Sequence, residues 1–409
     1  MTINSFLRLG TANSYTNSVA NLNDRQVSLS TLQQSLTSGL KNAHPADDPV
    51  GAAQAERAIT RLARIQSDQK ALGLQKDAIT SAESTLGSAV DALQSFRQLV
   101  VSAGNATLSP ADRQTVAQQL TSLRDQVFSL SNTTDANGNP LFGALGSALA
   151  PFVQQSSSPG TYTFNGIAGQ TSSTSVSIPA ALDGDKAFMF KPGQDASFNV
   201  SYSTNAGLTS TGAVTLQSPP TTVPTPNSSY QIQFQANALL GTMQYTVTQT
   251  TPPAAAVTSA PANFTSGTPI TFDGLSLTVT GTPQSLDTLN IQANTSIFGV
   301  MDKAIADIGS APSSLVASQA VGQALANIDL GINRLQAARG LAGDLMNRSD
   351  TIGAAQTAGA TQAEADRSSA QDVNMVQAIS DFQNQQTGFS AALQSYAQIQ
   401  KLSLFNYIG

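Results

Sequence analysis

The sequence carries one large apolar residue at every seventh position through the stretch 65–100. This row consists of Ile65, Leu72, Ile79, Leu86, Leu93 and Val100. A companion row three positions later contains Ala82, Ala89, Phe96 and Ala103. Rows spaced by three and four residues are the a and d positions of a heptad repeat, which gives a helix one narrow apolar face. A helix of this length, roughly 60 Å at ~1.5 Å per residue, cannot cover that face by itself. The pattern therefore predicts partner helices alongside it.

The partner helices are predicted at the two ends of the chain. The same alternating spacing is followed by Met375, Ile379, Phe382, Gln386, Phe389, Leu393 and Tyr396. It is also followed by Val321, Leu325, Ile328, Ile332 and Leu335. Near the amino end, one seven-spaced row contains Leu22, Leu29 and Leu36. The sequence therefore predicts an α+β protein, in which a long antiparallel coiled-coil helical bundle from both termini carries an inserted β-rich domain.

Charged residues are scarce in this chain. They make up 11% of the 409 residues, against about 25% in an ordinary globular protein. A surface with so little charge is typical of a protein that packs against neighbours. The net charge is −6 and the basic residues are scattered, so no basic face for nucleic acid is predicted.

Several classes of site and targeting segment have no support in the sequence. The chain has no cysteine, which excludes disulfides, thiolate metal sites and thiol nucleophiles. The amino end lacks the apolar core of about 7 to 15 residues that a cleavable secretory signal needs. No run approaches the ~18 apolar residues of a membrane span. We therefore expect no membrane partner and, if the protein leaves the cell, an export route that does not read a classical signal.

Helix boundaries are marked by capping residues. Gly39 suits a helix end, and Asp47 or Asp48 suits an N-cap because Pro49 follows at the first helical position. Ser109 suits the N-cap of the next helix. Helices are therefore predicted to end near 38 and to restart near 49, with later helices at 110–131, 297–308, 314–360 and 372–408.

Between residues 141 and 295 the sequence changes character. Ser, Thr, Pro and Gly dominate, and short β-type runs recur. Strands are predicted at 162–164, 176–178, 187–190, 198–202, 230–234, 244–247 and 270–279. The last run contains Asp273 and Gly274, which form a strong hairpin signal. A proline-rich stretch at 219–226 would separate two lobes of this domain.

Four stretches resemble the flagellin superfamily. They are LTSGLKNAHPADDPVGAAQAER at 36–57, NTTDANGNPLFGA at 132–144, PITFDGLSLTVTGTPQSLDTLNI at 269–291 and AALQSYAQIQKLSLFNYIG at 391–409. They occur in the order found in that family and cover both ends of the chain, whereas 150–265 resembles no family. The proline-bearing form PADDPVGAA is most similar to the members of the family that join the flagellar hook to the filament.

The resemblance implies a structural subunit of a helical tube outside a bacterium. It implies partners: further copies in a ring, the other hook-filament junction protein, flagellin, and an export chaperone that binds the last helix before type III export without a cleaved signal peptide. It also implies a division of the chain. Segments 1–45 and 371–409 would form an inner assembly layer, 46–140 and 296–370 a helical bundle, and 141–295 an outer β-rich domain.

Two groups of residues are candidates for the assembly or chaperone interface. Arg57, Arg61 and Arg64 share one helical face, which is either solvated or a salt-bridge stripe between subunits. The candidate acceptors are Asp344, Asp350 and Glu364. Apolar heptad residues form the second group, either as a core within one subunit or as a core shared with a neighbour or chaperone, since an uncovered apolar face is sticky. This group contains Leu22, Leu29, Leu36, Met375, Ile379, Phe382, Phe389, Leu393 and Tyr396.

No catalytic, cofactor-binding or metal residues are predicted. Asp47, Asp48 and Glu56 have no second motif to support acid-base chemistry, and capping explains them. His44 is the only histidine, so a Ser-His-Asp or zinc site has nothing to build on. An enzyme is therefore the weakest interpretation. The alternatives to a junction subunit are flagellin itself, which shares the helices, and a secreted coiled-coil adhesin or stalk protein.

Overall fold

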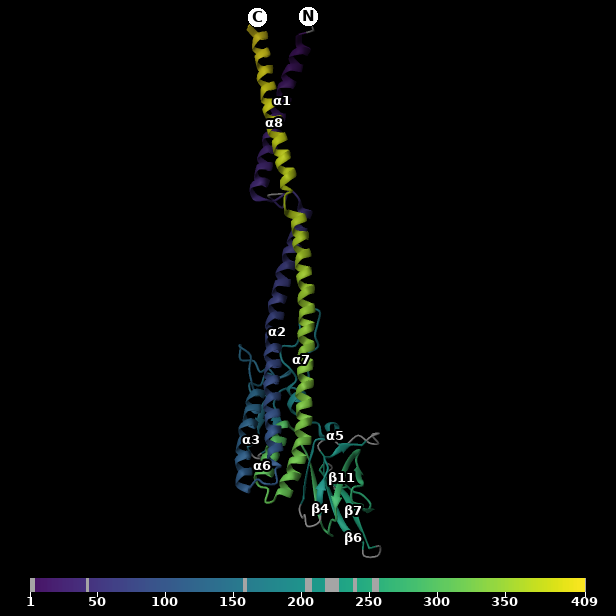
Figure 1. Cartoon of the computed structure of the whole chain (residues 1–409). Helices are drawn as coiled ribbons and strands as arrows, with labels where there is room; N and C mark the ends of the chain where they lie inside the picture. Colours follow the sequence, from purple (N-terminus) through teal and green to yellow (C-terminus); the bar gives the residue numbers. More distant parts are fainter. Residues whose placement is uncertain are drawn as a thin grey trace. The chain divides into compact units, whose positions relative to one another are not determined.

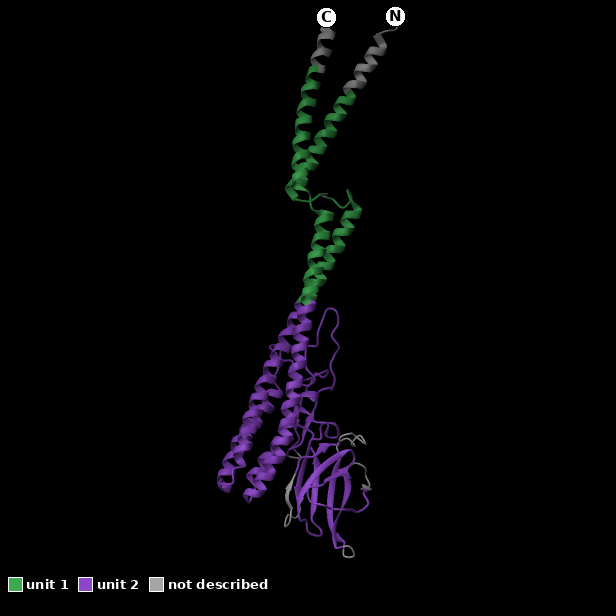
Figure 2. Ribbon diagram, turned by 45° about the vertical axis from the view of Figure 1, so that its right-hand side comes forward, with its two compact units in different colours: residues 1–69, 353–409 green, residues 70–352 purple. Residues whose placement is uncertain are grey.

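The computed structural model describes residues 4–41, 44–156, 160–202, 208–217, 228–237, 241–251 and 257–408. It combines long helices with antiparallel sheets in two compact units, which Figure 2 draws in two colours. The first unit consists of residues 1–69 and 353–409, and the second of residues 70–352. The first unit thus contains both ends of the chain. The predicted division into five segments stays a prediction.

The long helices begin and end close to the predicted boundaries. They are α1 (Asn4–Ser38), α2 (Pro49–Ala103), α3 (Pro110–Ser131), α6 (Ile297–Gly309), α7 (Ser314–Gln371) and α8 (Met375–Ile408). The Asp48 carboxylate accepts a hydrogen bond from the Gly51 amide at 2.9 Å, which caps α2. Ser109 and Asp112 form a reciprocal capping box at α3. Helix α7 is longer than predicted, because it continues past residue 360 and ends at Gln371, just before α8.

The heptad face of α2 is buried against the second unit's core. Leu86, Phe96 and Val100 have no exposed surface, and the remaining seam residues of this unit are at most 5% exposed. Helix α7 lies alongside α2 (Figure 1), as three ion pairs between the two helices show. These pairs are Lys76 with Asp350, Glu83 with Arg339, and Arg97 with Asp329. Residue numbers rise along α2 as they fall along α7, so the two helices run antiparallel.

An aromatic cluster attaches the stretch after α3 to this helical core. The Phe298 ring of α6 lies 5.1 Å from that of Tyr162, 5.4 Å from Phe128 and 5.6 Å from Phe152, measured between centroids. Phe152 and Tyr162 come from a small two-stranded sheet, β1 (Phe152–Gln154) with β2 (Tyr162–Phe164). Aromatic pairs at such distances add stability beyond their buried area. The small sheet therefore belongs to the core of the helices.

Two strand predictions in this stretch are wrong. The first half of 187–190 belongs to α4 (Gly184–Phe188), so Ala187 and Phe188 are helical, and both are fully buried. Residues 176–178 form no strand; there the Ile178 amide donates to the Gln75 side chain at 3.1 Å. Ile178, Ala187 and Phe188 are buried by packing on the helices instead, whereas Val176 is 43% exposed. The predicted strand at 162–164 is confirmed as β2.

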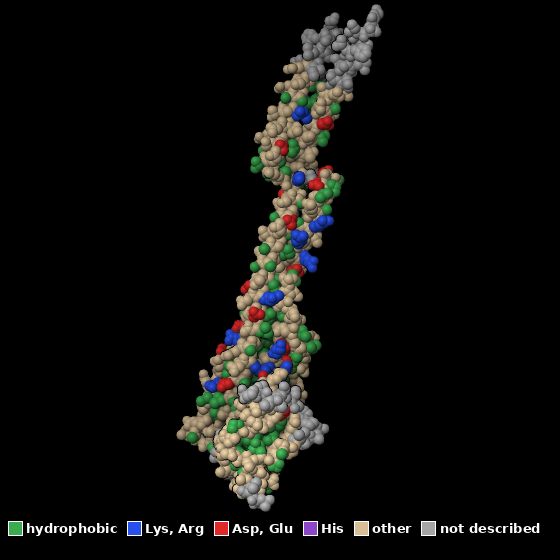
Figure 3. All heavy atoms as spheres, turned by 90° about the vertical axis from the view of Figure 1, so that its right-hand side faces the viewer, with side chains coloured by type: hydrophobic (Ala, Val, Ile, Leu, Met, Phe, Trp, Pro, Cys, Tyr) green, Lys and Arg blue, Asp and Glu red, His purple; other side chains and the backbone are tan. Residues whose placement is uncertain are grey.

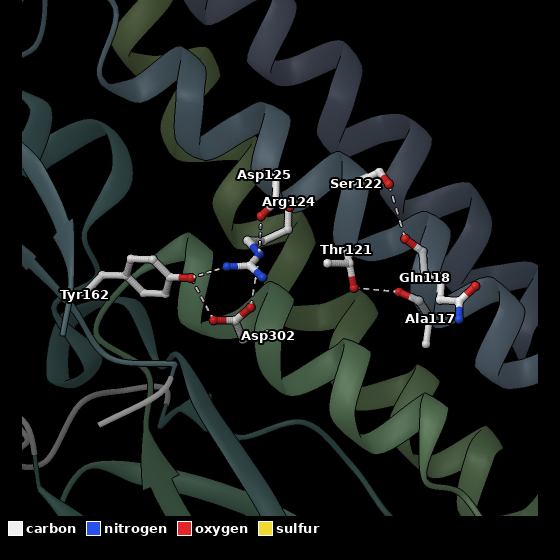
Figure 4. Close-up of polar contacts among 8 residues, drawn as sticks. All are labelled: Ala117, Gln118, Thr121, Ser122, Arg124, Asp125, Tyr162 and Asp302. Carbon is white, nitrogen blue, oxygen red and sulfur yellow. Dashed lines mark hydrogen bonds and ion pairs between the residues drawn. The ribbon is translucent and has the colours of Figure 1, made fainter. Parts of the chain in front are cut away.

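A polar cluster beside these rings ties three elements together (Figure 4). Arg124 of α3 donates to the Tyr162 hydroxyl at 2.8 Å, and that hydroxyl donates to Asp302 of α6 at 2.8 Å. Arg124 also pairs with Asp302 at 3.2 Å. Burial raises the pKa of the Asp302 carboxyl above its ordinary value, and the hydrogen bond from Tyr162 and the charge of Arg124 offset only part of this rise. Arg124, Tyr162 and Asp302 thus bond to one another within the protein, and the Arg124 Nε makes ion-pair contacts only, which indicates a structural role.

The second apolar core lies in a two-sheet module, residues 196–293. A four-stranded sheet and a six-stranded sheet, both antiparallel, contribute to this core. The four-stranded sheet contains β4 (Leu208–Thr211), β5 (Thr215–Leu216), β10 (Pro269–Phe272) and β11 (Leu275–Gly281). The six-stranded sheet contains β3 (Phe198–Tyr202), β6 (Ser229–Asn237), β7 (Thr242–Thr251), β8 (Val257–Thr258), β9 (Ala262–Asn263) and β12 (Thr288–Ala293).

The hairpin prediction is confirmed in this module. Strands β10 and β11 pair directly across Asp273 and Gly274, whose φ angles are 42° and 71°. Two successive positive φ angles are the mark of a type I′ turn. The predicted strands at 198–202, 230–234 and 244–247 are also confirmed, as parts of β3, β6 and β7. The predicted lobe boundary at 219–226 lies outside the described residues.

Candidate assembly interface

Helices α1 and α8 lie side by side in the first unit (Figure 1). The short non-helical segments that precede α2 and α8 are joined to each other by backbone hydrogen bonds. The Lys41 amide donates to the Gln371 carbonyl at 2.8 Å, and the Val373 amide donates to the Gly39 carbonyl at 2.9 Å. This antiparallel bridge fixes the end of α1 against the start of α8, so the first and last helices are presented together.

The α1–α8 pair buries little of its own surface. Among the described side chains of the two helices, only Ser35 and Ala378 are buried. Leu22, Leu29 and Leu36 are each partly buried, as expected for a row that faces one partner helix. A helix pair has no third element to cover its remaining apolar residues. The pair therefore has apolar surface left for contacts with other molecules.

The face that α8 turns towards α1 differs in register from the predicted one. The buried or partly buried positions are Ala378, Asp381, Phe382, Gln385, Gly388, Phe389, Ala392 and Tyr396. Phe382, Phe389 and Tyr396 lie on this face. The predicted row of residues 379, 386 and 393 does not face α1, since Ile379 and Leu393 are each 45% exposed and Gln386 is exposed. Small residues at 378 and 392 allow the helices to approach closely, so the inner row lies one position earlier than the apolar pattern indicates.

This shift leaves a second apolar surface on α8, which we call the α8 strip. It consists of Met375, Val376, Ile379 and Leu393, with exposed fractions of 45%, 82%, 45% and 45%. Val27 on α1 is 64% exposed. Large apolar residues grouped on one helix mark contact sites more often than isolated ones do. Three of the four residues of the strip are among the predicted interface residues, and Val376 is not, because it lies off the heptad positions.

The three arginines of α2 also lie on the surface of the first unit. Arg61 pairs with Asp366 of α7 at 3.4 Å, and both side chains are largely exposed. A groove of about 370 Å³ beside this pair is lined by Arg57, Arg61, Asp366 and Ser369, among others. Arg57 and Arg64 are exposed and have no ion-pair partner among the described residues. Exposed pairs of this kind contribute ~0 to 1 kcal/mol, so Arg61 contributes little to the stability of the isolated chain.

Two of the predicted acceptors are already used within this chain. Asp350 pairs with Lys76, and Glu364 pairs with Arg367 of the same helix. The partner that the structure gives to Arg61, Asp366, was missed from the sequence. Its pairing depends on the relative register of two helices about 300 residues apart in sequence, as the separation of 305 shows. No local signal reports that register.

Other kinds of site find no support in the described part of the chain. No three potential metal ligands among His, Cys, Asp and Glu gather there. His44 is exposed in the turn before α2. No described helix is both long and apolar enough to cross a lipid bilayer. Charged side chains are sparse on the face drawn in Figure 3, and most of that surface is uncharged.

The amino-terminal helices are similar in sequence to those of known flagellar proteins. Residues 10–145 match the family model described as the bacterial flagellin N-terminal helical region. Flagellar hook-associated protein 3 of Salmonella typhimurium is 32% identical over 150 residues, which are 36% of this chain and 47% of that protein. Flagellin of Serratia marcescens is 33% identical over a shorter stretch of 121 residues, 29% of this chain and 34% of that protein. The chain thus spans about half the length of the hook-associated relative it matches.

Solved structures extend the similarity beyond these helices. The flagellar hook associated protein-3 of Legionella pneumophila aligns with a TM-score of 0.63 and 25% identity, covering 76% of this chain and 97% of that one. The flagellar junction protein FlgL of the same organism aligns with a TM-score of 0.58 and 25% identity, covering 73% and 99%. Residues 10–145 are therefore similar to the N-terminal helical region of the bacterial flagellins, and the chain, as its motifs predict, resembles flagellar hook-associated protein 3 in both sequence and fold.

Proposed function

We propose that this chain is a structural adaptor subunit of the bacterial flagellum that joins the hook to the filament. The observation that carries the proposal is the similarity in sequence and fold to relatives named hook-associated protein 3 and junction protein FlgL. The exposed α8 strip supports it independently, because a subunit of an assembly needs apolar surface that only its neighbours cover.

In the proposed assembly, α1 and α8 form the inner layer with the segments 1–45 and 371–409. The segments 46–140 and 296–370 form an antiparallel coiled-coil bundle around α2 and α7, and the segment 141–295 forms an outer β-rich domain. The ion pairs between α2 and α7 and the buried heptad seam support this bundle. The interface residues are those of the α8 strip, the α1 leucines Leu22, Leu29 and Leu36, and the three arginines of α2.

The proposed partners follow from the same resemblance. They are further copies in a ring, the other hook-filament junction protein, flagellin, and an export chaperone that covers α8 before assembly. The protein works outside the cell after flagellar type III export without a cleaved signal peptide. Its role is mechanical and involves no catalysis, cofactor, nucleic acid or membrane.

A filament-seeding experiment separates this function from that of flagellin, which matches a shorter part of the chain. We expect that purified chain added to short filament seeds does not lengthen them, because an adaptor ends one tube and begins another. Purified flagellin added to the same seeds is the control and should lengthen them. Electron microscopy measures the length distribution. Continuous growth of the seeds by this chain would instead make it a filament subunit.

A further inference from the structure

The contact between the two-sheet module and helix α7 is polar, although each side has an apolar core of its own. The helical core and the module core share no residue among the described parts of the chain. The chain crosses between them twice, at 190–197 and at 294–296. These two connections are themselves hydrogen-bonded, from the Phe190 amide to the Thr295 carbonyl and from the Asn294 amide to the Ser197 carbonyl, both at 2.9 Å.

Asn327 of α7 is the centre of this contact. Its side chain is 3% exposed, and its amide nitrogen lies 3.0 Å from the Phe198 carbonyl and 3.2 Å from the Asn199 side-chain oxygen. Its side-chain oxygen accepts a hydrogen bond from the Ser197 hydroxyl at 3.2 Å. Asn294 donates to the same hydroxyl at 3.2 Å. One buried side chain of α7 therefore bonds the first connection and the start of β3, and it is linked to Asn294 of the second connection through the Ser197 hydroxyl.

Two further polar contacts surround Asn327. Gln323, one turn earlier on α7, donates to the Gly212 carbonyl at 2.9 Å. Arg334 of α7 bonds both carboxylate oxygens of Asp195, at 2.8 and 2.9 Å, with both side chains about one fifth exposed. Both bonds are donated by the same nitrogen, Nη1 of Arg334, and a hydrogen bond between charged groups is stronger than one between neutral groups. The contacts of Gln323, Asn327 and Arg334 thus hold the module in one position on α7.

We propose that Asn327, with Gln323 and Arg334, forms a polar latch that holds the two-sheet module on α7 and that can open while both cores stay folded. Opening an apolar contact exposes surface that water disfavours, whereas latch groups that separate can bond to water. While closed, the buried hydrogen bonds of Asn327 favour one arrangement of the module on α7. The latch therefore gives the module a fixed orientation and a single local opening transition. This inference does not depend on the assembly in which the chain works.

Amide hydrogen exchange in the full chain tests the latch. Asn327→Leu keeps the side-chain size but leaves the Phe198 carbonyl and the Ser197 hydroxyl without their α7 partner. We expect exchange in the connections 190–197 and 294–296 to accelerate at least tenfold, with β6 and α6 unchanged. Asn333→Leu, an exposed position on the same helix, is the matched control and should change neither. Arg334→Met is a milder variant at the rim of the latch and should give the same pattern with a smaller acceleration.

The outcomes separate the alternatives. Acceleration confined to the two connections supports the latch. Equal acceleration in β6 would show that the module unfolds rather than undocks, and it would overturn the proposal. Unchanged exchange in the connections in both latch variants, or the same acceleration in Asn333→Leu, would also overturn it.

Discussion

Replacing Val376 and Ile379 by aspartate should leave flagellar hooks without filaments while the chain stays folded. Both side chains belong to the α8 strip and are 82% and 45% exposed in the single chain, so the substitution removes little internal packing. In an assembly that covers the strip, each aspartate would be buried without a partner, which costs several kcal/mol per charge. We therefore expect normal far-ultraviolet circular dichroism and thermal midpoint, with motility lost.

The measurement uses a strain whose own gene is deleted and which carries the variant on a plasmid. Swimming in soft agar and electron microscopy of isolated hooks report attachment, and detection of the variant in the medium shows that it was exported. The matched control is Asn384→Asp with Ser395→Asp, which adds the same charge at exposed positions on another face of α8. Filaments on hooks made with Val376→Asp and Ile379→Asp, or their equal loss in the control, would contradict the role of the strip.

Leu86→Ala should destabilise the second unit by about 2 to 5 kcal/mol, the usual cost of removing a fully buried leucine side chain. Leu86 has no exposed surface and lies in the centre of the α2 seam. Leu74→Ala, on the same helix at 62% exposure, removes the same atoms and should change stability by less than about 0.5 kcal/mol. Urea unfolding followed by circular dichroism measures both. Similar losses for the two variants would show that the seam is not the packing core of α2.

Local signals predicted the helices well. The heptad seam at 65–100 needed only its own spacing, and the boundaries at Ser38, Pro49 and Ser109 needed only the capping chemistry of neighbouring residues. The hairpin at Asp273 and Gly274 was predictable for the same reason, since its turn type demands those residues. In each case the physical cause lies within about a turn of the residue concerned.

The errors arose where distant segments decide the outcome. No strand forms at 176–178 or at 187–190, because Ile178, Ala187 and Phe188 pack against the helical core instead. The local sequence carries no information about that packing. The register of α8 was one position off, because Ala378 and Ala392 let α1 approach more closely than the large residues at 379 and 393 would. Asp366 as the partner of Arg61 depends on how α2 and α7 align. Neither the packing of these segments, nor the register of α8, nor the alignment of α2 with α7 can be predicted from the residues nearby in the sequence.

Electron microscopy of a strain that lacks this gene tests most directly whether the chain joins the hook to the filament. We expect complete hooks that carry no filaments, with flagellin shed into the medium, and restored filaments when the full chain is supplied from a plasmid. Filaments of normal length on the hooks of a strain without the gene would show that the chain is not the adaptor.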